Sequence, residues 1–263
     1  MTSSEPFPEP PHTVTFDCWS TLIHEAGTSH GHSKRVNLIS EAARSPEGRA
    51  REALAEAWRY HQIRWHARVA FTARDMTRHA LELLGAELPE DRYEELVLKL
   101  EDEALKSEIR ALPGAKQTLE RLKALGVRRA LVCDTGFSPG RVVRQLLDRV
   151  GLLSLLEVTV FSDEILVPKP HPKAFETALS GLGVSASGSV HVGDLRRSDV
   201  AGARAHGMRT IRLAAHHDDA DEGSGKAAGV IDCSVAGCSP VCERPEADRV
   251  ARSYADVDRI LGV

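Results

Sequence analysis

The chain has 263 residues, of which 42% are hydrophobic, 27% charged and 5% aromatic, and its formal net charge is −4. This composition is typical of a globular protein and excludes the disordered, collagen-like and disulfide-scaffold classes. The near-neutral balance gives no reason to expect nucleic acid or an anionic membrane as a partner, because both favour an excess of basic residues. At roughly 100 to 200 residues per domain, the length fits one large domain or a core with a second small one.

The cysteines and the first residues predict a cytoplasmic protein. Cys18 and Cys133 stand singly in apolar runs, and the other three cysteines cluster late in the chain, which is not the even spacing of a secreted disulfide framework. The N-terminal sequence MTSSEPFPEPPH has no basic flank and no apolar stretch, so we expect no signal peptide. The longest apolar stretch, 152–161, is interrupted by polar residues and is too short to span a bilayer.

The predicted elements change in character along the chain. Residues 14–16 (VTF) predict a buried strand that ends at Asp17, and the segment 33–107 predicts helices that break near 45–46, 72 and 88–89. Beyond residue 114 the pattern alternates. We expect helices at 115–125, 141–150, 173–182 and 199–206, separated by strands at 130–133, 158–161, 190–192 and 210–213. A polar loop, 214–244, and a closing helix, 246–261, complete the chain.

Strands that alternate with helices predict βαβ units and therefore a Rossmann-like, doubly wound parallel sheet of the α/β class. The helical stretch interrupts this pattern and predicts a small all-helical domain. We therefore expect a flexible tail over 1–11, a core made of 12–26 and 112–263, and a helical insertion over 27–111.

In a sheet of this kind ligands bind outside the carboxyl ends of the strands. Reading off the residues at those ends gives Asp17, Cys133-Asp134-Thr135, Ser162-Asp163 with Lys169, and Gly193-Asp194. A carboxylate placed to attack, further carboxylates for a hard cation, a lysine and a hydroxyl donor suit the transfer of a phosphoryl group. Mg²⁺ prefers oxygen ligands and keeps several waters, so few protein ligands suffice.

At this point the residues resemble a known family. FDCWSTL (16–22), LVCDTG (131–136), VPKPHPKAF (167–175) and VHVGDLRRSDVAGARAHGM (190–208) are similar to the four ordered motifs of the haloacid dehalogenase superfamily. One such motif alone is a weak signal, whereas four in order are a strong one. The resemblance covers 12–26 and 112–263, and the helical insertion resembles the family's cap domain in position and helicity.

The resemblance implies a role for each matching residue. Asp17 is the expected nucleophile, which forms an aspartyl-phosphate, Thr21 supports its loop, and Lys169 neutralises the nucleophile and the phosphate. Mg²⁺ is expected between Asp17, Asp194, Asp199 and the backbone carbonyl of Trp19, although Asp199 is equally suited to cap a helix. The expected substrate is a small phosphorylated molecule, which the residues Trp19, Cys133, Asp134, Gly136 and Arg196 would contact.

The sequence departs from the family pattern at two positions. Where the family's phosphatases carry a second aspartate as general acid and base, this chain has Trp19, whose indole transfers no proton at neutral pH. A general acid or base is typically worth about 10²–10⁴-fold in rate, so its loss is tolerable for an acyl or enol phosphate and serious for a sugar or alkyl phosphate. Where the family carries a Ser or Thr phosphate donor, this chain has Cys133, a weak donor, and Thr135 two residues later is the preferred alternative.

The missing acid leaves two other functions open. The family's dehalogenases carry an aromatic residue at the position of Trp19, and their aspartate attacks carbon without a metal. Their last motif lacks the Gly-Asp pair followed by a second aspartate, so Gly193-Asp194 and Asp199 favour phosphoryl transfer. The other alternative is a binding protein that kept the crevice and lost turnover.

Further residues are weaker candidates. His24, His30 or His32 has a suitable pKa for the role that Trp19 cannot fill. Leu54, Trp58, His61, Trp65 and Val69 share one helix face, which is more often a packing face than a ligand site. Zinc at Cys233, Cys238 and Cys242, with His216 or His217 as a fourth ligand, is not favoured, because the spacing differs from common zinc sites.

Overall fold

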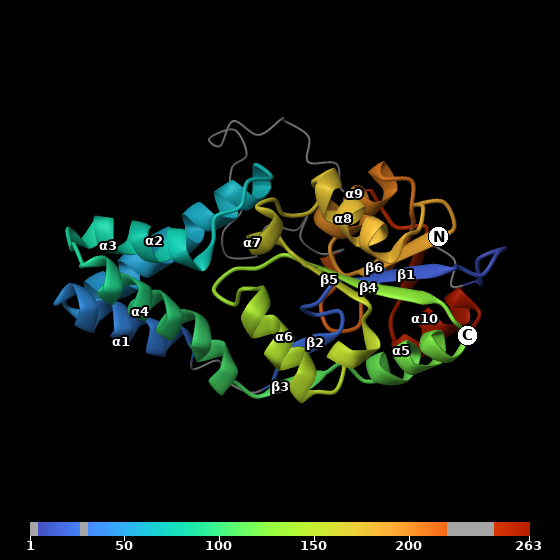
Figure 1. Cartoon of the computed structure of the whole chain (residues 1–263), viewed down its shortest axis with the longest axis horizontal. Coiled ribbons are helices and arrows are strands. Elements are labelled where there is room, and N and C mark those ends of the chain that lie inside the picture. The colour runs from blue at the N-terminus through green and yellow to red at the C-terminus, as the bar shows by residue number, and fades with distance from the viewer. Residues whose placement is uncertain (1–4, 27–30, 220–244) are drawn as a thin grey trace.

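The computed structural model describes residues 5–26, 31–219 and 245–263. A six-stranded sheet forms its centre, with helices on both faces, and a group of helices extends from one end (Figure 1). The sheet order is β5-β4-β1-β6-β7-β8 and every neighbouring pair is parallel. Its strands are β1 Thr13–Phe16, β4 Arg128–Cys133, β5 Val158–Phe161, β6 Ser189–Gly193, β7 Arg209–Leu213 and β8 Arg249–Ala251. The predicted α/β class with a parallel sheet is confirmed.

Alternating residues of the strands pack against different helices, as the two-residue period of a strand requires. In β4, Leu131 and Cys133 belong to the apolar cluster under α5, α6 and α10, whereas Ala130 and Val132 belong to the cluster under α8 and α9. These two helical layers lie on opposite faces of the sheet in Figure 1. The helices of the core are α5 Ala115–Ala124, α6 Gly140–Arg149, α7 Ser162–Ile165, α8 Pro172–Leu182, α9 Ala201–Ala205 and α10 Tyr254–Leu261, with short turns η2 Leu153–Leu155 and η3 Arg196–Val200.

The helical insertion has an apolar cluster of its own. It contains α1 Gly31–Ala43, α2 Glu47–His66, α3 Ala73–Leu84, α4 Glu90–Asp102 and the short turn η1 Glu103–Lys106. Buried residues such as Ile39, Leu54 and Met76 pack together within it. The predicted breaks are confirmed, because Pro46, Thr72 and Pro89 stand at the N-caps of α2, α3 and α4.

Two short strands join the insertion to the core, and the sequence analysis missed both. β2 (Ile23–Glu25) and β3 (Ile109–Ala111) pair antiparallel where the chain leaves the core and where it returns. Strands of three residues are too short to show a period of two, so only their tertiary pairing reveals them.

The C-terminal segment and part of the predicted tail differ from expectation. A single helix was predicted over 246–261, but β8 precedes α10, because the Asp248 carboxylate accepts hydrogen bonds from the backbone N–H and the hydroxyl of Thr210 and fixes the segment beside β7. Near the N-terminus, Phe7 is buried against the core and its N–H donates to the carbonyl of Ile260 over 3.0 Å, so residues 5–11 are held more firmly than a flexible tail.

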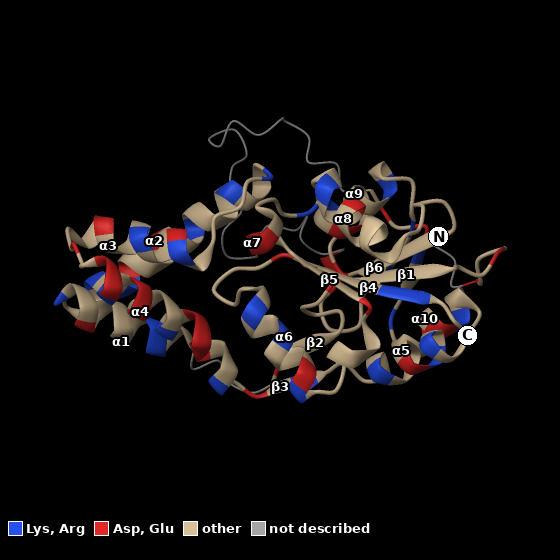
Figure 2. Ribbon diagram, in the orientation of Figure 1, with Lys and Arg blue, Asp and Glu red and all other residues tan. Residues whose placement is uncertain are grey.

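Charged side chains of both signs occur on each of the helices α1, α2, α3 and α4, and Figure 2 shows them interspersed over the insertion and the core. None of the helices in the described part of the chain is long and apolar enough to cross a membrane.

Candidate active site

Three carboxylates meet at the carboxyl ends of two neighbouring strands. Asp17 follows β1, Asp194 follows β6, and Asp199 lies in the turn η3 that comes next. One oxygen of each lies within 4.8 Å of the others, and all three residues are buried. The prediction that strand-end residues converge is therefore met at these positions.

Lys169 lies between two of these carboxylates. Its Nζ is 2.6 Å from Oδ1 of Asp17 and 2.6 Å from Oδ1 of Asp199, and the side chain is almost completely buried. Burial by itself lowers the pKa of a lysine, but the charges of Asp17 and Asp199 outweigh it and hold the pKa of Lys169 well above its usual value. The lysine therefore stays charged in the site.

The two carboxylates beside Lys169 respond differently to burial. Burial raises the pKa of Asp17 to about 8 against the effect of Lys169, and the nearby charges of Asp199 and Asp194 add to the rise. Burial acts on Asp199 in the same direction, but Lys169 and His191 outweigh it and hold its pKa below the usual value. Asp17 is thus the carboxylate whose ionised form is least compensated.

The hydrogen bonds divide the carboxylate oxygens into occupied and open ones. Oδ1 of Asp199 accepts from Lys169 and lies 3.2 Å from Nε2 of His191, and its Oδ2 accepts from the N–H of Leu195 over 3.0 Å. By contrast, Oδ2 of Asp17 and Oδ1 of Asp194 accept no hydrogen bond from the described part of the chain. Asp199 therefore holds Lys169 in place, while Asp17 and Asp194 keep oxygens for a ligand.

A divalent cation fits this donor set. Three ionised carboxylates against one ammonium leave two formal negative charges, and the open oxygens of Asp17 and Asp194 are hard ligands of the type that Mg²⁺ takes. Gly193 permits the arrangement, because a Cβ at this position would lie 2.4 Å from Cγ of Asp199. The glycine of the Gly-Asp pair is thus needed for the close approach of Asp199 to β6.

The loop after Asp17 turns back sharply. Ser20 has a φ of 60°, in the left-handed region, and the N–H of Leu22 donates to the carbonyl of Cys18 over 2.8 Å. Thr21 is fully buried; its carbonyl accepts from the hydroxyl of Tyr254, and its own hydroxyl has no hydrogen-bond partner in the described part of the chain. The contact with Tyr254 fixes Thr21 in the loop that follows Asp17, and its supporting role stays a prediction.

Cys133 and Thr135 are the predicted phosphate donors after β4, and the thiol or hydroxyl of each is engaged within the protein. Cys133 is 1% exposed and its Sγ contacts the carbonyl of Asp134 at 3.4 Å. The hydroxyl of Thr135 lies 3.0 Å from Oδ1 of Asp163 and 3.0 Å from Oγ of Ser162, so its single proton is engaged. The choice between Cys133 and Thr135 stays a prediction.

Asp134 connects the core to the insertion. Its Oδ1 accepts from the backbone N–H of Lys169 over 2.9 Å, and its Oδ2 accepts from the indole N–H of Trp65, on α2, over 2.8 Å. The ring of Trp65 also lies 3.7 Å from the guanidinium carbon of Arg197, which belongs to η3. The insertion is thereby held over the strand ends that carry the carboxylates.

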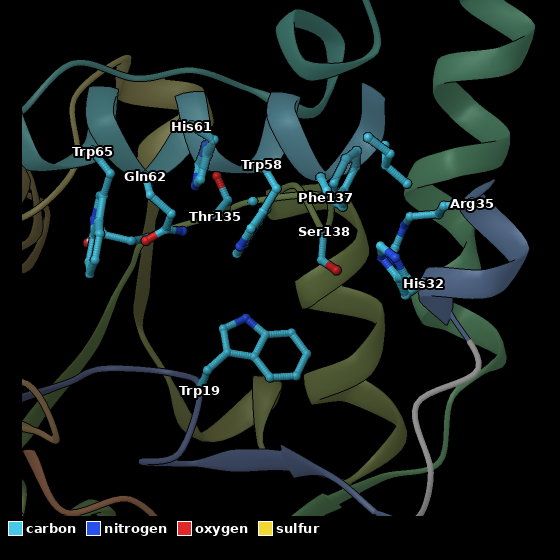
Figure 3. Close-up of a pocket in the computed structure, with 14 residues that line it drawn as sticks. Trp19, His32, Arg35, Trp58, His61, Gln62, Trp65, Thr135, Phe137 and Ser138 are labelled. Atoms are coloured by element: carbon cyan, nitrogen blue, oxygen red, sulfur yellow. Dashed lines mark hydrogen bonds between the residues drawn. The ribbon is translucent and has the colours of Figure 1, made fainter. Parts of the chain in front are cut away.

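A cavity of about 550 Å³ lies between α2 and the core (Figure 3). Trp58, His61 and Trp65 extend into it from α2, and Trp19 lies on the opposite side. Gly136 borders the cavity, and a Cβ there would lie 2.9 Å from the Trp58 ring. On the helix face interpreted from sequence as a packing face, Leu54 does pack in the apolar cluster of the insertion. Leu54, Trp58, His61 and Trp65 also border the cavity.

Several weaker candidates lie elsewhere. Arg196 is bound to Asp219, through its backbone N–H over 2.5 Å and its guanidinium over 2.6 Å, and does not line the cavity. The ring of His24 lies 4.5 Å from that of His216, beside a separate, smaller cavity, whereas His32 does line the large one. The proposed zinc ligands Cys233, Cys238 and Cys242, and the candidate His30, lie outside the described residues.

Comparison with known proteins decides the family. A family model described as a haloacid dehalogenase-like hydrolase matches residues 11–207. The chain belongs to this family. The matched range contains Asp17, Lys169, Asp194 and Asp199, which the structure brings together.

Relatives of this haloacid dehalogenase-like chain include both phosphatases and dehalogenases. A glyceraldehyde 3-phosphate phosphatase of Pyrococcus abyssi is 37% identical over 103 residues, which are 39% of this chain and 42% of that protein. An HAD phosphatase from Thermococcus onnurineus has a TM-score of 0.60 at 23% identity, covering 95% of this chain and 97% of that chain. An L-2-haloacid dehalogenase from Xanthobacter autotrophicus has a TM-score of 0.57 at 20% identity, covering 96% and 98%. The two structural likenesses concern the fold, and the match to the curated relative spans less than half of its length.

Two histidines of this family member were not singled out from sequence as contacts of the carboxylates. His191, within β6, lies 2.7 Å from the hydroxyl of Thr15 through Nδ1 and reaches Asp199 through Nε2. Nδ1 of His217, after β7, lies 3.0 Å from Oδ2 of Asp194. The signal for His191 is its place two residues before Gly193 in a strand that ends at the site. His217 was considered only as a zinc ligand.

Proposed function

We propose that this hydrolase-family member is a Mg²⁺-dependent phosphatase that acts on a small phosphorylated molecule through an aspartyl-phosphate at Asp17. The observation that carries the proposal is the group of Asp17, Asp194 and Asp199, with oxygens within 4.8 Å of one another and Lys169 bridging two of them. We also propose that the insertion over 27–111 acts as a cap on a core of 12–26 and 112–263, and that the protein is cytoplasmic.

Each residue of the group has a task that follows from its contacts. Asp17 attacks through Oδ2, because Oδ1 is held by Lys169. Asp194 would hold Mg²⁺ with its open oxygen Oδ1, together with the Asp17 carboxylate and the backbone carbonyl of Trp19, in a way that leaves Oδ2 of Asp17 for the attack. Asp199 keeps Lys169 oriented through Oδ1. When bound, Mg²⁺ neutralises charge on the phosphoryl oxygens and favours the ionised form of the Asp17 carboxyl.

The reaction proceeds in two displacements. Oδ2 of Asp17 forms a bond to phosphorus while the ester P–O bond breaks, and the leaving oxygen takes the electron pair. A water then attacks the phosphorus of the aspartyl-phosphate, which releases orthophosphate and restores the Asp17 carboxylate. Lys169 balances negative charge during both steps, because it stays protonated beside Asp17.

The curated relative supports phosphatase chemistry and leaves the substrate open. The Pyrococcus abyssi protein is named a glyceraldehyde 3-phosphate phosphatase, but the matched segment covers 42% of it. Substrate choice in the proposed enzyme depends on the insertion, whose cavity-lining residues are outside the four motifs.

A dehalogenase is the second candidate, and Trp19 is the observation that favours it, since the family's dehalogenases carry an aromatic residue there. The buried carboxylates argue against it, because attack on carbon needs no cation, and the charges of Asp199 and Asp194 add to the rise in the pKa of Asp17 that burial causes. Phosphoryl transfer uses the negative charge of Asp194 and Asp199 to hold a cation, whereas in dehalogenation without a metal the same charge hinders ionisation of Asp17.

The test compares two product assays on the same protein. We expect Mg²⁺-dependent release of orthophosphate from an aryl phosphate, lost in Asp17→Asn and kept in the control Asp148→Asn, which changes an exposed aspartate of α6. Release of chloride from 2-chloropropionate without metal would instead establish the dehalogenase. Binding of orthophosphate without turnover in either assay would establish a binding protein that has lost its activity.

A further inference from the structure

The cavity beneath α2 borders the loop that follows Asp17, on the side of the missing acid at Trp19. Trp19, two residues after Asp17, forms one wall, and Asp134 and Thr135, at the end of β4, border it as well. A phosphate ester whose phosphorus is at Asp17 can extend its leaving group past Trp19 into this cavity. The lining of this cavity therefore bears on the chemistry of the leaving group.

Large aromatic side chains form part of the cavity wall on both of its sides. Trp19, Trp58, Trp65 and Phe137 all border it, and Figure 3 shows Trp19 lying across the open space from Trp58. Trp58 is fixed in a stack, with ring centroids 5.0 Å from His61 and 6.1 Å from Phe137 and interplanar angles of 21° and 16°. Aromatic groups of this kind bind a flat ring by stacking and by edge-to-face contact.

Several polar groups on the walls are already engaged. Asp134 accepts hydrogen bonds through both carboxylate oxygens, and Thr135 donates to Asp163. Nδ1 of His61 lies 2.6 Å from the carbonyl of Phe71, which only accepts, so this nitrogen carries the proton. A ligand with many hydroxyl groups would have to compete with these contacts, whereas a flat apolar ring would leave them intact.

Asp134 and His61 are also not placed to protonate the leaving oxygen of a phosphate ester. Asp134 faces two donors, and burial lowers the pKa of His61, so that its Nε2 is without a proton at neutral pH. Trp19 cannot serve as an acid. A phenol has a pKa of about 10, whereas an aliphatic alcohol is about as weak an acid as water, near 15.7. A phenolate therefore departs without a proton far more readily than an alkoxide.

The absent acid at position 19 and the aromatic residues that other elements contribute, Trp58, Trp65 and Phe137, point to the same leaving group. We propose that the substrate is a phosphate monoester of a planar aromatic hydroxyl compound, whose ring lies between Trp19 and Trp58. This inference rests on the proposed phosphatase function and narrows its substrate class.

Four phosphorylated compounds, three phosphate monoesters and one acyl phosphate, separate the two requirements. Phenyl phosphate has a ring and a good leaving group, benzyl phosphate has a ring and a poor leaving group, acetyl phosphate has a good leaving group without a ring, and glycerol phosphate has neither. With Mg²⁺, we expect the highest kcat/KM for phenyl phosphate. Benzyl phosphate should have the same KM as phenyl phosphate, but its kcat should be lower by about 10²-fold or more. Acetyl phosphate should have the same kcat as phenyl phosphate and a higher KM.

A variant pair tests the ring site itself. Trp58→Leu should raise the KM for phenyl and benzyl phosphate by about three- to tenfold and should raise the KM for acetyl phosphate by a smaller factor. The control is Tyr60→Leu, on the same helix, because Tyr60 contacts Phe71 and His79 and does not line the cavity. Acetyl phosphate turnover in Trp58→Leu also reports that the variant is folded.

The outcomes distinguish the two proposals. A kcat/KM for glycerol phosphate equal to that for phenyl phosphate, or an equal rise of KM for acetyl phosphate in Trp58→Leu, overturns the aromatic substrate class and leaves the phosphatase intact. If the enzyme releases phosphate from none of the four compounds with Mg²⁺ present, the proposed function itself fails.

Discussion

Nζ of Lys169 lies 2.6 Å from Oδ1 of Asp17, in an ion pair that is almost completely buried. The same ammonium group is equally close to Asp199, so one cation is shared by two carboxylates. A buried ion pair does not by itself stabilise a fold, because desolvation opposes the attraction. We interpret the pair as part of the reacting centre, with Lys169 aligned toward the nucleophile.

Removing the lysine should therefore affect both activity and stability. Lys169→Met leaves two buried carboxylates without their cation, so we expect kcat to fall by about 10²–10³-fold and the free energy of unfolding to fall by about 3 kcal/mol. Steady-state kinetics and urea denaturation measure the two effects. Lys173→Met, which changes an exposed lysine on α8, is the control. Unchanged activity in Lys169→Met would remove this residue from the mechanism.

Trp19→Asp tests the account of the missing acid. A carboxyl group at this position can protonate a leaving oxygen, so activity on alkyl phosphates such as glycerol phosphate should rise more than activity on phenyl phosphate. The gain in activity on alkyl phosphates should be at most about 10²–10⁴-fold. The ratio of the two kcat values is the measurement, because it cancels general damage to the site. A fall by the same factor for both substrates would show that more than one residue separates this chain from an alkyl phosphatase.

The strand-end argument predicted the centre of the site, because parallel strands end at one edge whatever covers their faces. It predicted that Asp17, Asp194 and Lys169 lie close together, and the structure shows that they do. It did not predict the cavity at Trp58, since the rotation of α2 about its axis depends on the β2–β3 pairing and on contacts such as that between Trp65 and Asp134. The contacts of His191 with Asp199 and of His217 with Asp194 were also missed, because they too depend on tertiary packing.

His217 should tune the affinity for the cation. It lies 3.0 Å from Oδ2 of Asp194 and thereby orients the oxygen that remains open. Loss of such an outer contact typically lowers metal affinity by about 10- to 100-fold. We therefore expect His217→Ala to need at least about tenfold more Mg²⁺ for half-maximal activity, with a similar kcat at saturating Mg²⁺. His216→Ala, which removes a ring packed on His24, is the control. Equal Mg²⁺ requirements in the two variants would contradict this role.

The raised pKa of Asp17 predicts a pH-dependent effect of Mg²⁺ on stability. Because burial raises this pKa to about 8, the folded state without metal favours the protonated carboxyl. Stability from this group is complete below the unfolded pKa of 3.8 and is lost as the pH rises through about 8. Mg²⁺ binds the ionised form and offsets this loss, so the rise in Tm on adding Mg²⁺ should be larger at pH 8.5 than at pH 6. Of the two test values, pH 6 lies inside the window between 3.8 and about 8, and pH 8.5 lies just above it. A rise in Tm that is the same at both pH values, or is larger at pH 6, would contradict this assignment.

The most direct measurement looks for the covalent intermediate on Asp17. The protein is mixed with phenyl phosphate and Mg²⁺, quenched in acid within milliseconds, digested, and analysed by mass spectrometry for the peptide that contains residue 17. We predict one added phosphoryl group on Asp17, absent when Mg²⁺ is removed. An ester of Asp17 formed from 2-chloropropionate without metal, with no phosphoryl group trapped from phenyl phosphate, would contradict the account.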